Sequence, residues 1–370
     1  MSAQVRLHVS RQGPRFTALP PLSLYIHIPW CVRKCPYCDF NSHEARGEIP
    51  EERYTNALIA DLEQSLPLIW GRKIYTIFFG GGTPSVLSAQ AIDTMLSAVR
   101  ARVPLAVDAE ITLEANPGTF ESVKFAGYRA AGVNRLSIGI QSFNAAHLKA
   151  LGRVHDAEQA RAALQIARAH FDNFNLDLMY ALPGQTLAGA ASDLKEALSF
   201  EPPHLSLYHL TIEPNTYFHR YPPQVPDDDI AAQMQDAAAA FLHQAGYEHY
   251  ETSAYARPGQ RARHNLNYWR FGDYLGIGAG AHSKLSFPER IVRQTRYRQP
   301  REYMDQALTG AAMQNESAVS AEDIPFEFMM NALRLNDGFE LALFEERAGM
   351  PLVSVLNTLE EAQRRGLLTR

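Results

Sequence analysis

The chain has 370 residues, of which 46% are hydrophobic and 20% charged, as is typical of a globular protein with one large or two ordinary domains. No apolar run approaches the roughly 18 residues that cross a bilayer, and residues 1–20 lack the apolar region of a secretory signal. The net charge of −5 argues against general nucleic-acid binding, and three clustered cysteines suit a reducing compartment. We therefore expect a cytoplasmic protein that binds no nucleic acid.

Residues 1–20 are predicted to be a flexible tail, and strand and helix patterns alternate from residue 22 to residue 210. We predict strands at 22–28, 74–79, 108–115, 135–140, 174–180 and 204–210. We predict helices at 52–66, 89–101, 120–132, 156–170 and 187–199. Repeated strand–helix units favour a parallel sheet, and strands this apolar are expected to be buried on both faces. Six units are fewer than the eight of a closed barrel, so we predict an incomplete (β/α)₆ barrel of the TIM type, with a doubly wound open sheet as the alternative.

The alternation ends near residue 220. Residues 21–220 therefore form the predicted barrel core, and residues 221–310 an α+β extension with a helix near 230–245 and strands within 247–256 and 274–283. Residues 311–370 are predicted to be a small helical module that resembles a winged helix. Between Thr252 and Arg301 ten basic residues face two acidic ones, which suggests an anionic ligand or surface, with a solvated face as the alternative.

Polar and glycine-rich segments follow each strand of the predicted barrel. They are the cysteine loop, GGGTP (80–84), EANPG (114–118), IQSF (140–143), Asp177 with LPGQT (182–186), and HLTIEPNT (209–216). Ligands of parallel α/β folds bind at the carboxyl ends of the strands. The sequence therefore predicts that the functional site lies at this end.

The three cysteines of the chain, Cys31, Cys35 and Cys38, lie within eight residues after the first predicted strand. Three thiolates can hold three irons of a [4Fe–4S] cluster, which leaves the fourth iron to a small-molecule ligand. A zinc ion with His27 or His43 as a fourth ligand is the alternative.

The spacing Cys-x3-Cys-x2-Cys after the first strand of a partial barrel resembles the radical S-adenosylmethionine (SAM) superfamily. The blocks LYIHIPWC, CPYC, FFGGGTPS, EANPG, GIQSF and DLMYALPGQT narrow the resemblance to the branch of the oxygen-independent coproporphyrinogen oxidases, from about residue 22 to the C-terminal module. The resemblance implies a [4Fe–4S] cluster whose free iron is chelated by the methionine part of SAM. In that superfamily an electron from the cluster cleaves SAM to a 5′-deoxyadenosyl radical.

The resemblance also implies which residues surround SAM. They are Tyr25, Tyr37, Gly81, Gly82, Thr83, Glu114, Gln141, Arg153 and Asp177. Glycines allow backbone carbonyls to approach the ammonium group, carboxylates suit ribose hydroxyls or the sulfonium charge, and an arginine suits the methionine carboxylate. Taken alone, the same residues also fit a tight turn, helix caps, salt-bridge partners, a surface arginine and a core tyrosine.

Phe40 departs from the oxidase pattern, because those enzymes carry a fourth cysteine at this position. This departure and the short N-terminal segment are shared by the HemW-type heme chaperones, which are similar to the oxidases. The block HNLNYW, His264 to Trp269, is typical of that group. The resemblance therefore implies that His264 binds heme iron, with arginines nearby for the propionates, whereas we do not predict His209 or His282 as ligands. On its residue type alone, a histidine beside aromatic rings is more often structural.

We predict a heme chaperone that binds a [4Fe–4S] cluster, SAM and heme and delivers heme to respiratory membrane proteins. It has no predicted catalytic residue and no predicted coproporphyrinogen oxidase activity, and cleavage of SAM is left open. The alternatives are a coproporphyrinogen III dehydrogenase, another radical SAM enzyme that modifies heme, and a binding module with a vestigial site. A homodimer and a peripheral membrane contact are further hypotheses.

Overall fold

Six parallel strands form the centre of the computed structural model, which describes residues 13–118 and 123–369. They are β1 (Leu22–Ile28), β4 (Ile74–Gly81), β5 (Leu105–Ala115), β6 (Arg135–Gln141), β7 (Phe174–Tyr180) and β8 (His204–His209). The strands lie side by side in chain order, and every neighbouring pair is parallel. This arrangement confirms the predicted incomplete barrel.

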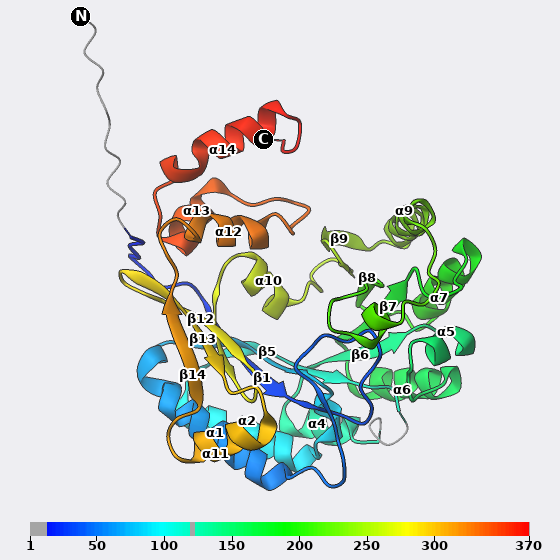
Figure 1. Ribbon diagram of the computed structural model, residues 1–370, viewed down its shortest axis with the longest axis horizontal. Helices are drawn as coiled ribbons and strands as arrows, with labels where there is room; N and C mark the ends of the chain where they lie inside the picture. The colour runs from blue at the N-terminus through cyan, green and yellow to red at the C-terminus, as the bar shows by residue number, and fades with distance from the viewer. Residues whose placement is uncertain (1–12, 119–122, 370) are drawn as a thin grey trace, which may run out of the picture.

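Helices cross over between the strands and cover the outer side of the curved sheet (Figure 1). They are α1 (Glu51–Ser65), α2 (Ala89–Arg102), α4 (Phe125–Ala131), α5 (Ala145–Ala150), α6 (Ala157–His170) and α7 (Leu187–Ser199). The first residues of the helix predicted at 120–132, and residues 1–12 of the predicted tail, lie outside the described residues. Polar side chains cap several helices; Asp156 accepts a hydrogen bond from Gln159 N (2.8 Å) and completes a capping box on α6.

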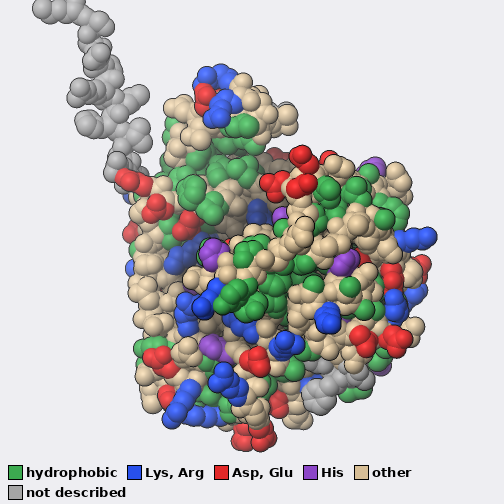
Figure 2. Space-filling view, turned by 45° about the vertical axis from the view of Figure 1, so that its right-hand side comes forward, with side chains coloured by type: hydrophobic (Ala, Val, Ile, Leu, Met, Phe, Trp, Pro, Cys, Tyr) green, Lys and Arg blue, Asp and Glu red, His purple; other side chains and the backbone are tan. Residues whose placement is uncertain are grey.

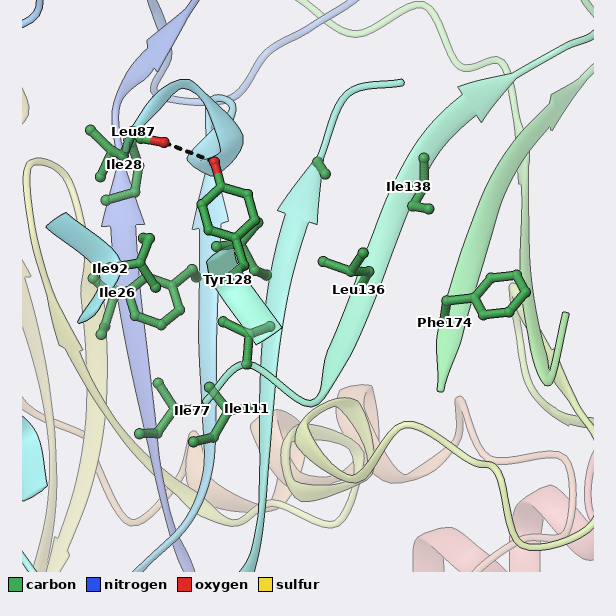
Figure 3. Packing of buried hydrophobic residues seen from close by; sticks show 14 of the residues in the cluster. Ile26, Ile28, Ile77, Leu87, Ile92, Ile111, Tyr128, Leu136, Ile138 and Phe174 are labelled. Atoms are coloured by element: carbon green, nitrogen blue, oxygen red, sulfur yellow. Dashed lines mark hydrogen bonds between the residues drawn. The ribbon is translucent and has the colours of Figure 1, made fainter. Parts of the chain in front are cut away.

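The two faces of the barrel strands differ in character. Ile26, Ile77 and Ile111 point outward and pack against the helices together with Tyr128, whose hydroxyl donates to the Leu87 carbonyl at 2.8 Å (Figure 3). The inner positions of the strands are polar and largely buried. They include Ser23, Thr76, Glu110, Thr112, Ser137, Asn175 and Ser206. The strands are therefore buried on both faces as predicted, but the inner face is lined by polar groups that hydrogen-bond to one another.

Strands from residues beyond 220 join both edges of the barrel sheet. Strand β11 (Asp273–Ile277) lies parallel to β1, and β12 (His282–Phe287), β13 (Arg290–Arg296) and β14 (Met313–Ala318) continue outward as antiparallel strands. Strand β14 falls within residues 311–370, where only a helical module was predicted. At the opposite edge β10 (Ala254–Ala256) pairs with β8, and β9 (Glu248–Glu251) pairs with β10. Residues far apart in the sequence therefore meet beside β1, where the cysteine loop begins.

The remaining α-helices are α8 (Tyr217–Arg220), α9 (Asp228–Gln244), α10 (Arg263–Trp269), α11 (Pro300–Leu308), α12 (Ile324–Ala332), α13 (Leu341–Ala348) and α14 (Val353–Arg364). Of these, α11 packs against α1 and α9 against α7, in the outer layer of helices. Helices α12 to α14 form the predicted helical module around Phe328 and Phe344, and this second hydrophobic cluster also takes in Phe271 and Ile291.

The C-terminal module projects from the rest of the molecule in the space-filling view (Figure 2). Hydrophobic side chains gather in the middle of the face below it, with Lys and Arg side chains around them. Among residues 13–118 and 123–369, no helix combines the length and the apolar character needed to cross a bilayer.

A buried ion pair joins α1 to β13. Arg296 of β13 donates to Asp61 of α1 at 2.9 Å, and both side chains are buried. The hydroxyl of Tyr303 and the backbone N–H of Gly278 also donate to Asp61, at 2.9 and 3.2 Å. Burial raises the pKa of Asp61, and these charged and polar partners oppose that rise.

We predict that Asp61→Asn lowers the free energy of unfolding by about 3–5 kcal/mol, because the Arg296 charge is left buried without its partner. Asp305→Asn is the matched control, since Asp305 pairs with Arg53 and joins α11 to α1 at half-exposed side chains. That change should cost at most about 1 kcal/mol. Equal losses for the two variants in urea unfolding would contradict the role of the buried pair.

Candidate cofactor and ligand site

The cysteine loop is held at both ends by a short parallel pair of strands, β2 (Trp30–Cys31) and β3 (His43–Glu44). The N–H of Ala45 donates to the Cys31 carbonyl at 2.9 Å. Within the loop, Cys38 N donates to the Cys35 carbonyl at 3.2 Å, and the Lys34 ammonium donates to two backbone carbonyls. The loop is thus a closed turn that carries all three cysteines.

The three cysteines are free thiols in polar surroundings. Cys31 is buried, whereas Cys35 and Cys38 are half-buried. The Arg153 guanidinium lies 3.6 Å from Cys35 Sγ, and Ser42 Oγ lies 3.7 Å from Cys38 Sγ. Burial raises the pKa of the Cys31 and Cys38 thiols. No group of three His, Cys, Asp or Glu side chains in the described parts of the chain, the three cysteines included, converges on a point that could hold a metal ion.

The turn at the end of β4 requires glycine, because neighbouring atoms leave no room for a Cβ atom. Gly81 has a φ of 114°, and a Cβ atom there would lie 2.5 Å from the His27 ring. A Cβ atom on Gly82 would lie 2.6 Å from the Trp30 carbonyl oxygen. The N–H of Thr83 donates to the same carbonyl at 2.8 Å. These contacts press the turn against the start of the cysteine loop.

Two carboxylates lie on the inner face of the barrel, Glu114 on β5 and Asp177 on β7, with β6 between them. Glu114 accepts a hydrogen bond from Gly81 N at 3.2 Å. Asp177 accepts from Asn175 Nδ2 at 2.8 Å and from Ser137 Oγ at 3.1 Å. Burial and then the charge of Asp177 raise the pKa of Glu114 to about 8. A positively charged ligand would relieve this cost.

Gln141 and Arg153 lie at the end of β6, where the backbone is strained. Gln141 has a φ of 66°, which is uncommon for a residue with a side chain. The Arg153 guanidinium donates to the Gly139 carbonyl at 2.8 Å and to Asn116 Oδ1 at 2.7 Å. Burial raises the pKa of the neighbouring Tyr37, and the charge of Arg153 opposes that rise. Asn116 belongs to the EANPG segment, but the sequence alone did not identify it as a partner of Arg153.

A cavity of about 620 Å³ opens at the carboxyl ends of the strands, as predicted from the motifs. We call it the inner cavity. It is lined by Tyr25, His27, Phe40, Asn41, Gly81, Glu114, Tyr268, Tyr274, Gly280, His282, Thr295, Arg296, Arg298 and Gln314. Of the residues predicted to surround SAM, it brings together Tyr25, Gly81 and Glu114. Tyr37, Gly82, Thr83, Gln141, Arg153 and Asp177 do not line it.

His264 is enclosed within the barrel and has no free ring nitrogen. Its Nδ1 lies 2.8 Å from Thr76 Oγ1, its Nε2 lies 3.1 Å from Tyr268 Oη, and its side chain is 1% exposed. The ring also stacks on Phe78 at 4.9 Å, and burial lowers its pKa to about 3. This placement favours the structural interpretation of His264 and not that of an iron ligand.

Three arginines around the HNLNYW block contact acidic or aromatic side chains of the protein. Arg261 pairs with Glu248 and Asp337, and Arg263 pairs with Asp108. Arg257 stacks on a tyrosine ring instead. The sequence offered His282 only as a weaker heme-ligand candidate and did not single out Arg298, because the position of both residues depends on how β11 and β12 pair beside β1.

Comparison with known proteins agrees with this architecture. Residues 25–197 match the radical SAM superfamily, and residues 319–370 match the HemN C-terminal domain. The solved coproporphyrinogen III oxidase (HemN) of Escherichia coli, described as a radical SAM enzyme, is similar at a TM-score of 0.80 with 26% identity, over 95% of this chain and 85% of that one.

Similarity in sequence is greater still to proteins named heme chaperone HemW. The protein of Escherichia coli K12 is 52% identical over 95% of this chain and 92% of its own length. The protein of Haemophilus influenzae is 49% identical over 93% of this chain and 90% of its own length. The mouse protein named radical S-adenosyl methionine domain-containing protein 1, mitochondrial, is 41% identical over 71% of this chain and 60% of its own. The chain therefore belongs to the HemW family of the radical SAM superfamily.

Proposed function

We propose that this protein is a heme chaperone that carries a [4Fe–4S] cluster and SAM and passes heme to respiratory hemoproteins. The observation that carries the proposal is the 52% identity to the heme chaperone HemW of Escherichia coli over 95% of the chain. The proposal includes a heme-accepting membrane protein as partner and the cytoplasm as compartment. A homodimer and a peripheral membrane contact remain predictions.

The cysteine loop fits the cluster. Cys31, Cys35 and Cys38 are free thiols on one closed turn, and a set of three thiolates leaves one iron of a cube without a protein ligand. The charge of Lys34 opposes the effect of burial on the pKa of the Cys38 thiol, and the Arg153 guanidinium lies 3.6 Å from Cys35 Sγ. When bound, the cluster supplies an electron to SAM.

The neighbouring strand ends fit SAM. The uncompensated carboxylate of Glu114, with Asp177 beside it, favours a cationic ligand such as a sulfonium. Tyr25 and Gly81 line the same cavity and contact the ligand in this proposal. The other residues proposed to surround SAM are Tyr37, Gly82, Thr83, Gln141 and Arg153. For His264 the geometry supports a positioning role, since its Nε2 orients the Tyr268 hydroxyl at the cavity wall.

Coproporphyrinogen oxidation is the second candidate function, and the TM-score of 0.80 to the oxidase of Escherichia coli favours it. Phe40 argues against it, because oxidases of this branch carry a fourth cysteine at this position of the sequence. The Phe40 side chain is 64% exposed. Greater sequence identity to the chaperones points the same way.

The two functions predict opposite results in one assay. We expect anaerobic, cluster-reconstituted protein to bind heme and to leave coproporphyrinogen III unchanged when SAM and a reductant are present. The products are measured by chromatography, with the HemN enzyme of Escherichia coli as the positive control. Formation of protoporphyrinogen at a rate near that of the control would refute the chaperone assignment.

We predict that Cys35→Ala lowers bound iron and sulfide after anaerobic reconstitution to near background, because two thiolates cannot hold a cube with one free iron. Ser42→Ala is the control, since Ser42 contacts the sulfur of Cys38 without being a predicted ligand. It should retain most of its iron. Full iron content in the Cys35 variant would show that the cluster is held elsewhere.

The raised pKa of Glu114 predicts how stability depends on pH. The folded protein keeps a proton on Glu114 up to a pH of about 8, whereas an unfolded glutamate releases it near about 4.3. The free energy of unfolding therefore falls as the pH rises between these values, and Glu114→Gln should remove part of that fall.

Urea unfolding of cluster-free protein tests this at about pH 5.5 and about pH 8.5. Relative to the wild type, Glu114→Gln should gain stability at the higher pH. Glu63→Gln is the control, because Glu63 is half-exposed and pairs with Arg102 at the surface. A pH-independent difference between wild type and Glu114→Gln would contradict the proposed protonation.

A further inference from the structure

A second hollow of about 550 Å³ adjoins the inner cavity on the side of the cysteine loop. We call it the outer hollow. Four residues line both spaces: Phe40, Asn41, Arg298 and Gln314. The inner cavity also holds Tyr25, Gly81 and Glu114, which the proposed function gives to SAM. A larger ligand can therefore lie across the shared boundary while SAM occupies the inner end.

His282 begins β12 and presents an exposed imidazole to the inner cavity. Neither of its ring nitrogens makes a hydrogen bond with a residue in the described ranges 13–118 and 123–369. The other histidine of this cavity differs: His27 bonds to the Asn41 carbonyl at 2.9 Å and to Tyr25 Oη at 3.1 Å. His43 lines the outer hollow, but its unpaired Nε2 is enclosed by protein. His282 is thus the histidine that can bind an incoming metal without breaking a contact.

The walls beside His282 are aromatic and cationic. Tyr268 and Tyr274 pack edge to face at 4.5 Å on the cavity wall, and Phe40 stands 64% exposed at the boundary of the two spaces. Aromatic faces of this kind suit a flat apolar ring.

Arg298 lines both spaces, is exposed, and makes no ion pair with any residue among those described. Most other cations of this basic segment are engaged: Lys284 pairs with Asp273, Arg293 with Glu327, and Arg296 with Asp61. Two acids, Asp39 and Glu302, line the outer hollow alone. An anionic group at the boundary would therefore be drawn to Arg298.

We propose that heme, the cargo of the proposed function, binds across the boundary of the two spaces, with its iron on His282, its ring against Phe40 and a propionate on Arg298. This inference rests on the proposed function and deepens it. Imidazole is a common axial ligand of heme iron, and arginine pairs strongly with carboxylates. It also gives Phe40 a role: the side chain that replaces the cysteine of the oxidases supplies a face for the macrocycle.

Anaerobic heme titration of the cluster-reconstituted protein, followed by absorption and electron paramagnetic resonance, tests the assignment. His282→Ala should weaken heme binding at least tenfold and remove the spectral signature of an axial imidazole. Adding free imidazole should restore that signature. Arg298→Gln should weaken binding while it leaves the signature unchanged, because Arg298 contacts the propionate and not the iron.

Two histidine variants serve as matched controls. His43→Ala removes the other histidine near the boundary, and His243→Ala removes an exposed histidine of α9 that lines neither space. Both should keep the axial-imidazole spectrum of the wild type, and His243→Ala should also keep its affinity for heme. SAM binding and far-ultraviolet circular dichroism confirm that each variant is folded.

The outcomes separate this inference from the function on which it rests. If the wild type binds no heme, both are overturned. If the wild type binds heme but His282→Ala keeps the axial signature, or if His43→Ala loses it instead, the chaperone function stands and the assignment to His282 is overturned.

Discussion

The site depends on how closely three parallel strand ends approach one another around His27. The ring of His27 lies against Gly81 at the end of β4, and its backbone carbonyl lies against Gly278 just after β11. A Cβ atom on Gly81 would lie 2.5 Å from that ring, and one on Gly278 would lie 2.4 Å from that carbonyl oxygen. Because both glycines have positive φ angles and no side chain, β4 and β11 can flank β1 on either side. The cysteine loop therefore leaves β1 between β4 and β11.

The inner face of the barrel is lined by buried polar side chains. Hydrogen bonds among them offset the energetic cost of removing them from water. Ser23, Thr76 and His264 form one chain of bonds, and Asn175 joins Ser137 to Asp177 in another. Such networks specify a unique arrangement when every member is satisfied. Two members are less well satisfied: Thr112 Oγ1 is buried without a hydrogen-bond partner among the described residues, and the bond from Gly81 to Glu114 does not compensate for burial beside a second carboxylate. An unbalanced carboxylate in a cavity is a feature of a binding site more than of a structural core.

The same pairing of β1 with β11 places His264 and His282 in different surroundings, one enclosed and one open to the inner cavity. His264 lies on α10, inside the barrel, and both of its ring nitrogens are used. His282 follows β11 and faces the cavity from the opposite side of β1, near the unpaired Arg298. The proposed heme site thus combines His282 and Arg298 with Phe40 of the cysteine loop, which lies more than two hundred residues earlier in the sequence.

The sequence by itself determined the barrel, the cysteine loop and the end of the sheet at which the inner cavity opens, because local periodicity and turn residues specify strands, helices and connections. It also singled out Tyr25, Gly81 and Glu114, which lie in three strands of the repeating units and line that cavity. Only the tertiary structure decided that β11 pairs with β1 and that β10 pairs with β8, since strands that are distant in the sequence carry no local signal of their partners. It likewise decided that His264 is enclosed while His282 is open, because burial depends on how α10 and β12 pack and not on the residue type.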